Sequence, residues 1–277
     1  MLKAKQISVI ALVIVLMTAL YALDIKRLVK EEGDTNAKEQ PVNDQLDLQA
    51  ISQTAKNSLN ANLATEIENL EAALKNADES EKADLVKQLA EKWDDVNQPA
   101  PAAFYYEMMA ISKPDYQNWL NSGDRFTAAY QASQDTTLQP ALVQKAINAY
   151  QEALKTNAES LDAKTGLGVA YVNGTSNPMQ GIQLLLEVVK KDPLNIKANT
   201  NLGLFSMRSG QFDKAVERFK TITELKPDPE AWFYLASSYE NLGQNQEAIL
   251  AYLKAKELAA DPGLSKFVDQ KIQALKK

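Results

Sequence analysis

The sequence predicts an all-α protein built from repeated helical hairpins. Its 277 residues include only ten glycines and ten prolines, and they are rich in alanine, leucine, lysine, glutamate and glutamine, a composition that favours helices. Similar residues also recur at a period near 34 through residues 83–261, and this period is typical of a helical solenoid. Residues 262–277 place Phe267, Val268, Ile272 and Leu275 on one helical face and charges elsewhere, which predicts a capping helix whose apolar face is buried.

The clearest repeat unit is residues 229–258, which read PEAWFYLASSYENLGQNQEAILAYLKAKEL. Its characteristic residues fall at fixed offsets: Trp232, Leu235, Ala236 and Tyr239 in the first helix, Gly243 at the corner, and Ala248, Tyr252 and Ala255 in the second helix. The unit resembles the tetratricopeptide repeat (TPR), because seven positions agree with the family pattern W-x2-L-G-x2-Y and its continuation, with Ala236 replacing the usual glycine. The resemblance implies an α-solenoid in which hairpins form a right-handed superhelix.

The same phase extends upstream over about five units, which cover residues 83–261. The preceding unit shares Leu202, Gly203, Gly210, Ala215, Phe219 and Pro227. The first unit, from about Ala83, is degenerate, and the second carries an insertion at about 131–141. Small residues let the two helices of a hairpin approach closely, and large aromatic residues fill the space between hairpins.

The first thirty residues predict a membrane anchor. Ile7–Leu23 is uncharged and spans roughly 25 Å as a helix, near the lower limit for crossing a lipid bilayer, and lysines and an arginine flank it. A cleaved signal peptide is the alternative, although no clean small-x-small cleavage site follows. We expect a single-pass protein whose soluble domain is exported, or periplasmic, as is common for bacterial proteins of this arrangement. Residues 31–43 are polar and predict a flexible linker.

Residues 44–82 predict an N-terminal helical region, with one helix running from about Asp44 to Ala77. Within it Leu63, Ile67, Leu70 and Leu74 form an apolar stripe. We expect this stripe to pack on the first repeat. A coiled-coil homodimer is the alternative, but the stripe extends over barely two heptads.

The composition excludes several kinds of chemistry. The chain has no cysteine and no histidine, so thiolate zinc sites, iron–sulfur clusters, cysteine nucleophiles and Ser-His-Asp triads are ruled out. Residues 31–277 hold 25 basic and 35 acidic residues, and such an acidic surface makes a nucleic-acid partner unfavourable. Catalysis by a pair of carboxylates or a Ser-Lys dyad stays open. With the usual catalytic groups missing, we expect no enzymatic activity and no cofactor or metal.

The family resemblance also places a partner-binding groove on the first helix of each unit. Of the side chains that this register puts in the groove, the candidate contacts are Leu120, Asp124, Val169, Val172, Lys197, Leu204, Met207, Phe233 and Glu240. They lack the lysine and asparagine set with which some TPR domains bind chaperone tails. Apolar anchors mixed with acids suit an amphipathic helix or an extended segment that carries a basic residue. Packing against the neighbouring helix is the alternative role of each side chain.

These observations predict a membrane-anchored scaffold that binds another protein, with assembly of envelope complexes as one such role. Two alternatives stay open. The insertion at 131–141 could shape a pocket for a small ligand or substrate, or the helical region at 44–77 could mediate homo-oligomerisation.

Overall fold

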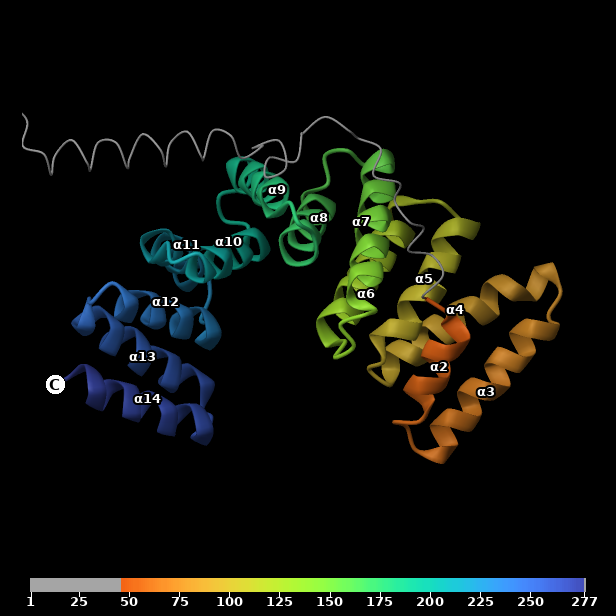
Figure 1. The fold of residues 1–277 in the computed structure, drawn as a ribbon, viewed down its shortest axis with the longest axis horizontal. Helices are drawn as coiled ribbons and strands as arrows, with labels where there is room; N and C mark the ends of the chain where they lie inside the picture. The colour runs from red at the N-terminus through yellow and green to blue at the C-terminus, as the bar shows by residue number, and fades with distance from the viewer. Residues whose placement is uncertain (1–45, 277) are drawn as a thin grey trace, which may run out of the picture. The chain divides into compact units, whose positions relative to one another are not determined.

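The computed structural model describes residues 46–276, and every regular element in this range is an α-helix (Figure 1). The helices are α2 (Leu48–Lys56), α3 (Ala61–Asn76), α4 (Glu79–Asp95), α5 (Pro99–Ser112), α6 (Tyr116–Ala132), α7 (Gln139–Thr156), α8 (Leu161–Gly174), α9 (Pro178–Lys191), α10 (Ile196–Arg208), α11 (Phe212–Leu225), α12 (Pro229–Asn241), α13 (Asn245–Ala259) and α14 (Pro262–Leu275). No helix within 46–276 has the length and apolarity needed to span a bilayer. The predicted anchor at Ile7–Leu23 and the linker at 31–43 lie outside the described residues.

The helices from α4 to α13 form consecutive hairpins. The pairs are α4–α5, α6–α7, α8–α9, α10–α11 and α12–α13, and the second helix of each pair also packs against the first helix of the next. Helix α14 packs on α13 at the end of this series, and its buried residues are Val268 and Ile272 (Figure 1). The described part of the chain is thus the predicted array of helical hairpins.

The prediction of one continuous helix from Asp44 to Ala77 is wrong. The chain forms α2 and α3, separated by a turn at residues 57–60. The Asn60 side chain explains the break, because its oxygen accepts a 3.0 Å hydrogen bond from the Leu63 amide and so caps a new helix. Helix α2 is held by Lys56, which is almost fully buried and donates a 2.8 Å hydrogen bond to Glu71 of α3.

Close approach of the two helices within a hairpin depends on glycine at two positions. A Cβ atom on Gly123 would lie 2.7 Å from the ring of Tyr150, and one on Gly203 would lie 2.8 Å from the ring of Phe219. Both rings are fully buried. The small residues in the first helices therefore leave space for the aromatic side chains of the second helices, as the pattern predicts.

The insertion in the second unit mainly lengthens its helices. Helices α6 and α7 have 17 and 18 residues, whereas α10 and α11 have 13 and 14. Only residues 133–138 remain as a connection between α6 and α7. At the corresponding turns of the last two hairpins, Gly210 and Gly243 adopt φ of +73° and +72°, a left-handed conformation that glycine adopts without strain.

Candidate partner-binding site

The candidate contacts all lie on the first helices of hairpins, as expected. Leu120 and Asp124 are in α6, and Val169 and Val172 are in α8. Lys197, Leu204 and Met207 are in α10, and Phe233 and Glu240 are in α12.

Two of the predicted anchors are buried within the protein. Leu120 and Val169 are each only 8% exposed and belong to hydrophobic clusters between neighbouring helices. Their role in the free protein is therefore packing. Asp124 is also engaged, because the Tyr150 hydroxyl donates a 2.8 Å hydrogen bond to its carboxylate. Burial and the Asp124 charge raise the pKa of Tyr150 well above its ordinary value, so this hydroxyl remains a donor.

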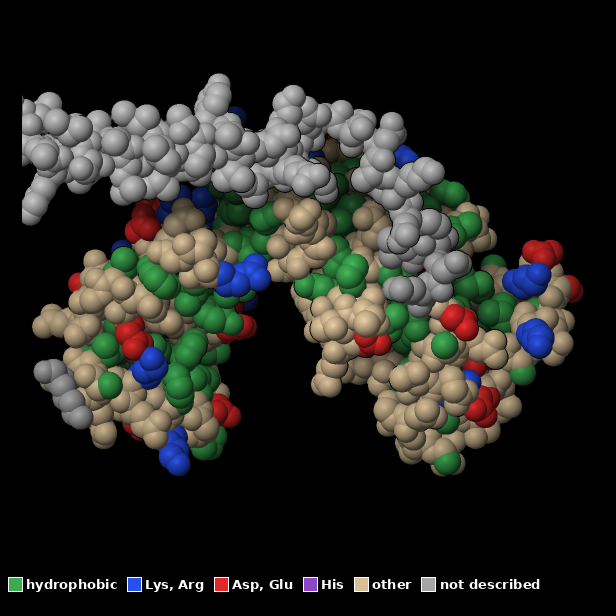
Figure 2. All heavy atoms as spheres, viewed as in Figure 1, with side chains coloured by type: hydrophobic (Ala, Val, Ile, Leu, Met, Phe, Trp, Pro, Cys, Tyr) green, Lys and Arg blue, Asp and Glu red, His purple; other side chains and the backbone are tan. Residues whose placement is uncertain are grey.

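Three other predicted anchors come together. Leu204, Met207 and Phe233 are half-buried and pack against the same hydrophobic cluster, which spans α11 to α14. We call these three residues the α10–α12 surface. Figure 2 shows hydrophobic side chains gathered along one edge of α12–α14, with single charged groups between them. These side chains still expose apolar surface to water. A partner that covers this surface would gain binding free energy from the hydrophobic effect.

The C-terminal helix extends this surface. The centroid of the Phe267 ring in α14 lies 5.8 Å from that of Phe233. The centroid of the Phe233 ring also lies 5.6 Å from that of Tyr252. The sequence pattern places Phe267 with Val268 on the buried face of the capping helix, and this placement is wrong for Phe267. Its side chain is 43% exposed, whereas Val268 is fully buried. Phe267 is a candidate contact that the repeat register alone does not reveal.

Glu240 forms a fixed acidic group beside these aromatic rings. Its carboxylate accepts a 2.7 Å hydrogen bond from the Tyr252 hydroxyl and a 2.8 Å hydrogen bond from Lys271 of α14. Burial alone raises the pKa of Glu240, but the hydrogen bonds from Lys271 and Tyr252 and the Lys271 charge outweigh it and lower the pKa. The group is therefore ionised at neutral pH and held in one orientation.

The remaining candidate contacts do not join the α10–α12 surface. Lys197 is exposed at the start of α10. Val172 instead lines a groove between the α8–α9 and α10–α11 hairpins. The structure thus divides the predicted set into buried residues, one coherent surface and residues that lie elsewhere.

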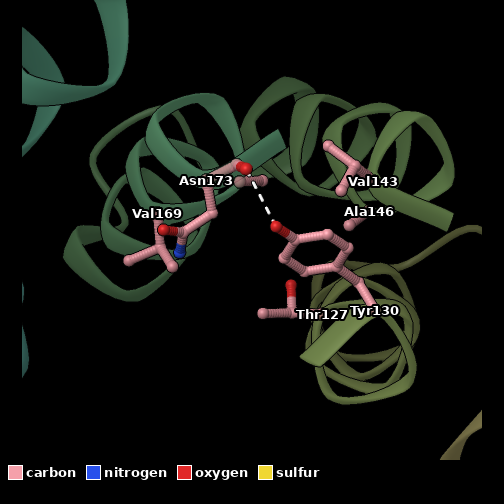
Figure 3. A pocket seen from close by; sticks show the side chains of 7 residues that line it. Thr127, Tyr130, Val143, Ala146, Val169 and Asn173 are labelled. Atoms are coloured by element: carbon pink, nitrogen blue, oxygen red, sulfur yellow. Dashed lines mark hydrogen bonds between the residues drawn. The ribbon is translucent and has the colours of Figure 1, made fainter. Parts of the chain in front are cut away.

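A small void between α6, α7 and α8 has no room for a ligand (Figure 3). Its volume is about 10 Å³, and its lining consists of Thr127, Tyr130, Val143, Ala146, Val169, Ala170 and Asn173. The Tyr130 hydroxyl closes it by donating a 2.8 Å hydrogen bond to the Asn173 carbonyl oxygen. This void holds at most about one water molecule.

The connection at 133–138 does help to line a larger open pocket. The pocket has a volume of about 720 Å³ and lies between α2, the start of α5 and the end of α6. Its lining is mostly small or apolar, with Asp47, Gln98 and Asp135 among its polar groups. Within residues 46–276, no group of three or more acidic side chains is arranged to hold a metal ion.

Comparison with known proteins identifies the repeats. Residues 200–265 match the family model described as tetratricopeptide repeat. This result confirms the predicted repeat type in the part of the chain that holds Leu204, Met207 and Phe233. Repeats of this family are typically non-enzymatic and bind other proteins.

Several solved structures resemble the chain. A crystal structure of MamA is 20% identical, with a TM-score of 0.48, and the alignment covers 65% of this chain and 92% of that one. A second MamA structure is 21% identical, with a TM-score of 0.48 and coverage of 61% and 94%. YrrB, described as a TPR protein with an unusual peptide-binding site, is 18% identical, with a TM-score of 0.47 and coverage of 74% and 99%. No curated protein matches the chain significantly.

Proposed function

We propose that the chain is a membrane-anchored scaffold that binds a helix or extended segment of another protein through the α10–α12 surface. The observation that carries the proposal is the convergence of Leu204, Met207 and Phe233 on one hydrophobic cluster within the tetratricopeptide repeats. Three apolar side chains within reach of one segment are the usual anchors for an amphipathic partner.

The charge next to this surface favours a partner with a basic residue. Glu240 is held by Tyr252 and Lys271, and it lies in the same helix as Phe233. A partner lysine or arginine that approaches Glu240 would form an ion pair at the rim of the interface, where such a pair contributes more to orientation and association rate than to affinity.

The anchor belongs to the same proposal. The uncharged segment Ile7–Leu23 and its basic flanks support insertion in a bilayer. We place the hairpins on the exported, periplasmic side because this arrangement is common for bacterial proteins with such an anchor. Tethering would concentrate the scaffold near other envelope proteins, and assembly of such complexes is the role that this arrangement favours.

Crosslinking followed by mass spectrometry tests the binding surface in native membranes. Met207→Glu places a charge on the α10–α12 surface at a half-buried position, and Leu250→Glu places one on α13, where Leu250 is 68% exposed. We expect Met207→Glu to remove a prominent partner while Leu250→Glu keeps it, with equal helical circular dichroism. Retention of every partner by Met207→Glu would contradict the proposal.

The pocket beside 133–138 supports a second candidate function, binding of a small ligand. Its volume of about 720 Å³ is within the range of ligand pockets, roughly 300–1,000 Å³. Leu138 and Ala132 line it from opposite ends of the connection. If the full chain binds a small molecule without a protein partner, and Ala132→Trp blocks that binding, this second function would gain support.

A further inference from the structure

A second open groove runs along the second helices of two neighbouring hairpins, and the proposed function does not use it. It lies between α9 and the α10–α11 hairpin and has a volume of about 760 Å³. We call it the α9–α11 groove. Its two sides differ. The apolar side chains come from α9 and α10, whereas the charged ones come from α11 and from Arg208 at the end of α10.

The apolar side of the groove is a stripe with helical spacing. Met179, Ile182 and Leu186 follow one another at i, i+3 and i+7 along α9, so they share one face of that helix. Met179 is 58% exposed and Leu186 is 44% exposed. Leu202 and Phe205 of α10 form the deeper part of the same apolar area.

The stripe is specific to α9. The positions one repeat later, 34 residues along the chain, are Asp213, Val216 and Lys220 in α11. Charged residues therefore stand in α11 where α9 exposes Met179 and Leu186. Single exposed apolar residues are normal on protein surfaces, but a continuous stripe with two exposed members over a groove marks an interaction site.

The charged side of the groove lacks carboxylate partners for its cations. Arg208, Lys214 and Arg218 line it, and none of them forms an ion pair within residues 46–276. They donate hydrogen bonds to neutral amides instead: Arg208 to Asn173, Lys214 to Gln211 and Arg218 to Asn199.

Arg125, the third arginine within residues 46–276, differs from Arg208 and Arg218 in its hydrogen-bond partner. Arg125 makes three hydrogen bonds to the Asp94 carboxylate, whereas both arginines without a carboxylate lie in the α9–α11 groove. Residues 46–276 carry 30 acidic and 23 basic residues, yet the groove has three basic residues against Asp213 and Glu217. The local charge is therefore opposite in sign to that of the domain. A guanidinium group binds a carboxylate more strongly than a neutral amide, because the hydrogen bonds become charge-assisted and bidentate.

We infer that the α9–α11 groove binds an amphipathic helix of a partner protein, with an apolar stripe on Met179, Ile182 and Leu186 and acidic residues facing Arg208 and Arg218. The exposed stripe spans about two helical turns, which matches a helix with anchors at i, i+3 or i+4, and i+7. Neither Met207 nor Phe233 lines this groove, so the inference extends the proposed function to a second partner-binding site.

A pair of designed peptides tests the inference. Both are fluorescein-labelled helices of about 16 residues with leucines at i, i+4, i+7 and i+11, and they carry either glutamates or lysines beside the leucines. Fluorescence anisotropy would be measured with the full chain in nanodiscs, and empty nanodiscs serve as the blank. We expect the glutamate peptide to bind at least about tenfold more tightly than the lysine peptide, and added salt to reduce this difference.

Matched variants locate the binding. Leu186→Gln should weaken binding of the glutamate peptide at least about tenfold and Arg218→Gln about fivefold, since the first removes an apolar anchor and the second a charged contact. The controls Leu250→Gln on α13 and Lys220→Gln on α11 should leave binding unchanged. Phe233→Ala in α12 should also leave it unchanged while it weakens binding at the α10–α12 surface, so failure of one proposal is distinguishable from failure of the other.

Three results would overturn the inference. The first is equal binding of the two peptides, and the second is binding that Leu186→Gln does not alter while circular dichroism shows the fold intact. The third is a concentration-dependent dimer in sedimentation equilibrium that Leu186→Gln dissociates, because this result would assign the groove to a second copy of the chain.

Discussion

The ring of Phe233 lies 5.8 Å from the ring of Phe267, so the last repeat and the C-terminal helix present one aromatic surface. We expect Phe267→Ala to weaken partner binding by about 1–2 kcal/mol, roughly five- to thirtyfold, because an exposed aromatic side chain at the centre of an interface is a common hot spot. The measurement is the affinity of the partner identified by crosslinking.

Val268→Ala is the matched control for Phe267→Ala. Val268 is fully buried on the inner face of α14. This variant therefore weakens the packing of α14 but keeps the exposed ring of Phe267. If Val268→Ala weakened binding as much as Phe267→Ala, the effect of Phe267 would come from the attachment of α14 and not from direct contact.

A methyl group at Gly123 should destabilise the second hairpin. The added Cβ would lie 2.7 Å from the ring of Tyr150, and that ring is also confined by Gly166, whose Cβ would lie 2.3 Å from it. Because the ring has no free space to move into, Gly123→Ala should lower the free energy of unfolding by about 1–3 kcal/mol. Urea unfolding followed by circular dichroism measures this loss.

Gly210→Ala provides the comparison for Gly123→Ala. Nothing lies within 4 Å of the Cβ it would add, and only its φ of +73° opposes the substitution. We therefore expect a smaller loss, about 1 kcal/mol. A larger loss for Gly210→Ala than for Gly123→Ala would show that backbone strain outweighs steric contact in this fold.

The helical hairpins could be predicted from the sequence because each one repeats the same short-range pattern. Glycine or alanine in the first helix and an aromatic residue in the second, as in Gly203 and Phe219, encode a contact within some twenty residues of chain. The break between α2 and α3 is not part of such a repeated pattern. It depends on the single side chain of Asn60, which caps a helix inside a segment whose apolar spacing continues.

The candidate site was less predictable, since the repeat register gives the direction of a side chain but not what covers it. Leu120 and Val169 lie on the expected helices and are nevertheless buried. The groove beside α9 could have been suspected from Met179 and Leu186, whose counterparts Asp213 and Lys220 are charged. Its depth comes from the packing of two hairpins, and no single-helix pattern contains that information.

The contact between the first two hairpins should depend on the geometry of an arginine. Arg125 of α6 donates hydrogen bonds of 2.6–2.8 Å to both carboxylate oxygens of Asp94 in α4, and Tyr106 donates another at 2.9 Å. Lysine keeps the charge but cannot form the bidentate arrangement. We expect Arg125→Lys to lower the free energy of unfolding by about 1–2 kcal/mol in urea titrations.

Lys155→Ala is the control for Arg125→Lys. It removes an exposed pair with Glu152 within one helix, and such pairs contribute about 0–1 kcal/mol. Equal losses for the two variants would mean that the Arg125 contact behaves as an ordinary surface ion pair.

The attachment of α14 should weaken in acid through Glu240. In the folded protein the hydrogen bonds and charge of Lys271 and the Tyr252 hydroxyl lower the pKa of Glu240 below its unfolded value, despite burial that raises it. A carboxyl group of this kind stabilises the folded state above its unfolded pKa of about 4.5, and the stabilisation is lost as the pH falls through the lower, folded pKa. Lys271→Met should therefore destabilise α14 at pH 7, and the difference from the unsubstituted chain should disappear toward pH 3.

Hydrogen exchange of the amides in 262–275 measures this effect locally. Lys266→Met is the control on the same helix, since Lys266 is exposed and has no carboxylate within 4 Å among residues 46–276. Protection factors corrected for the pH dependence of intrinsic exchange should fall at neutral pH for Lys271→Met only. A difference between Lys271→Met and the unsubstituted chain that persists unchanged at pH 3 would show that Lys271 acts through the cation–π contact of its nitrogen, which lies 5.8 Å from the centre of the Phe267 ring, and not through Glu240.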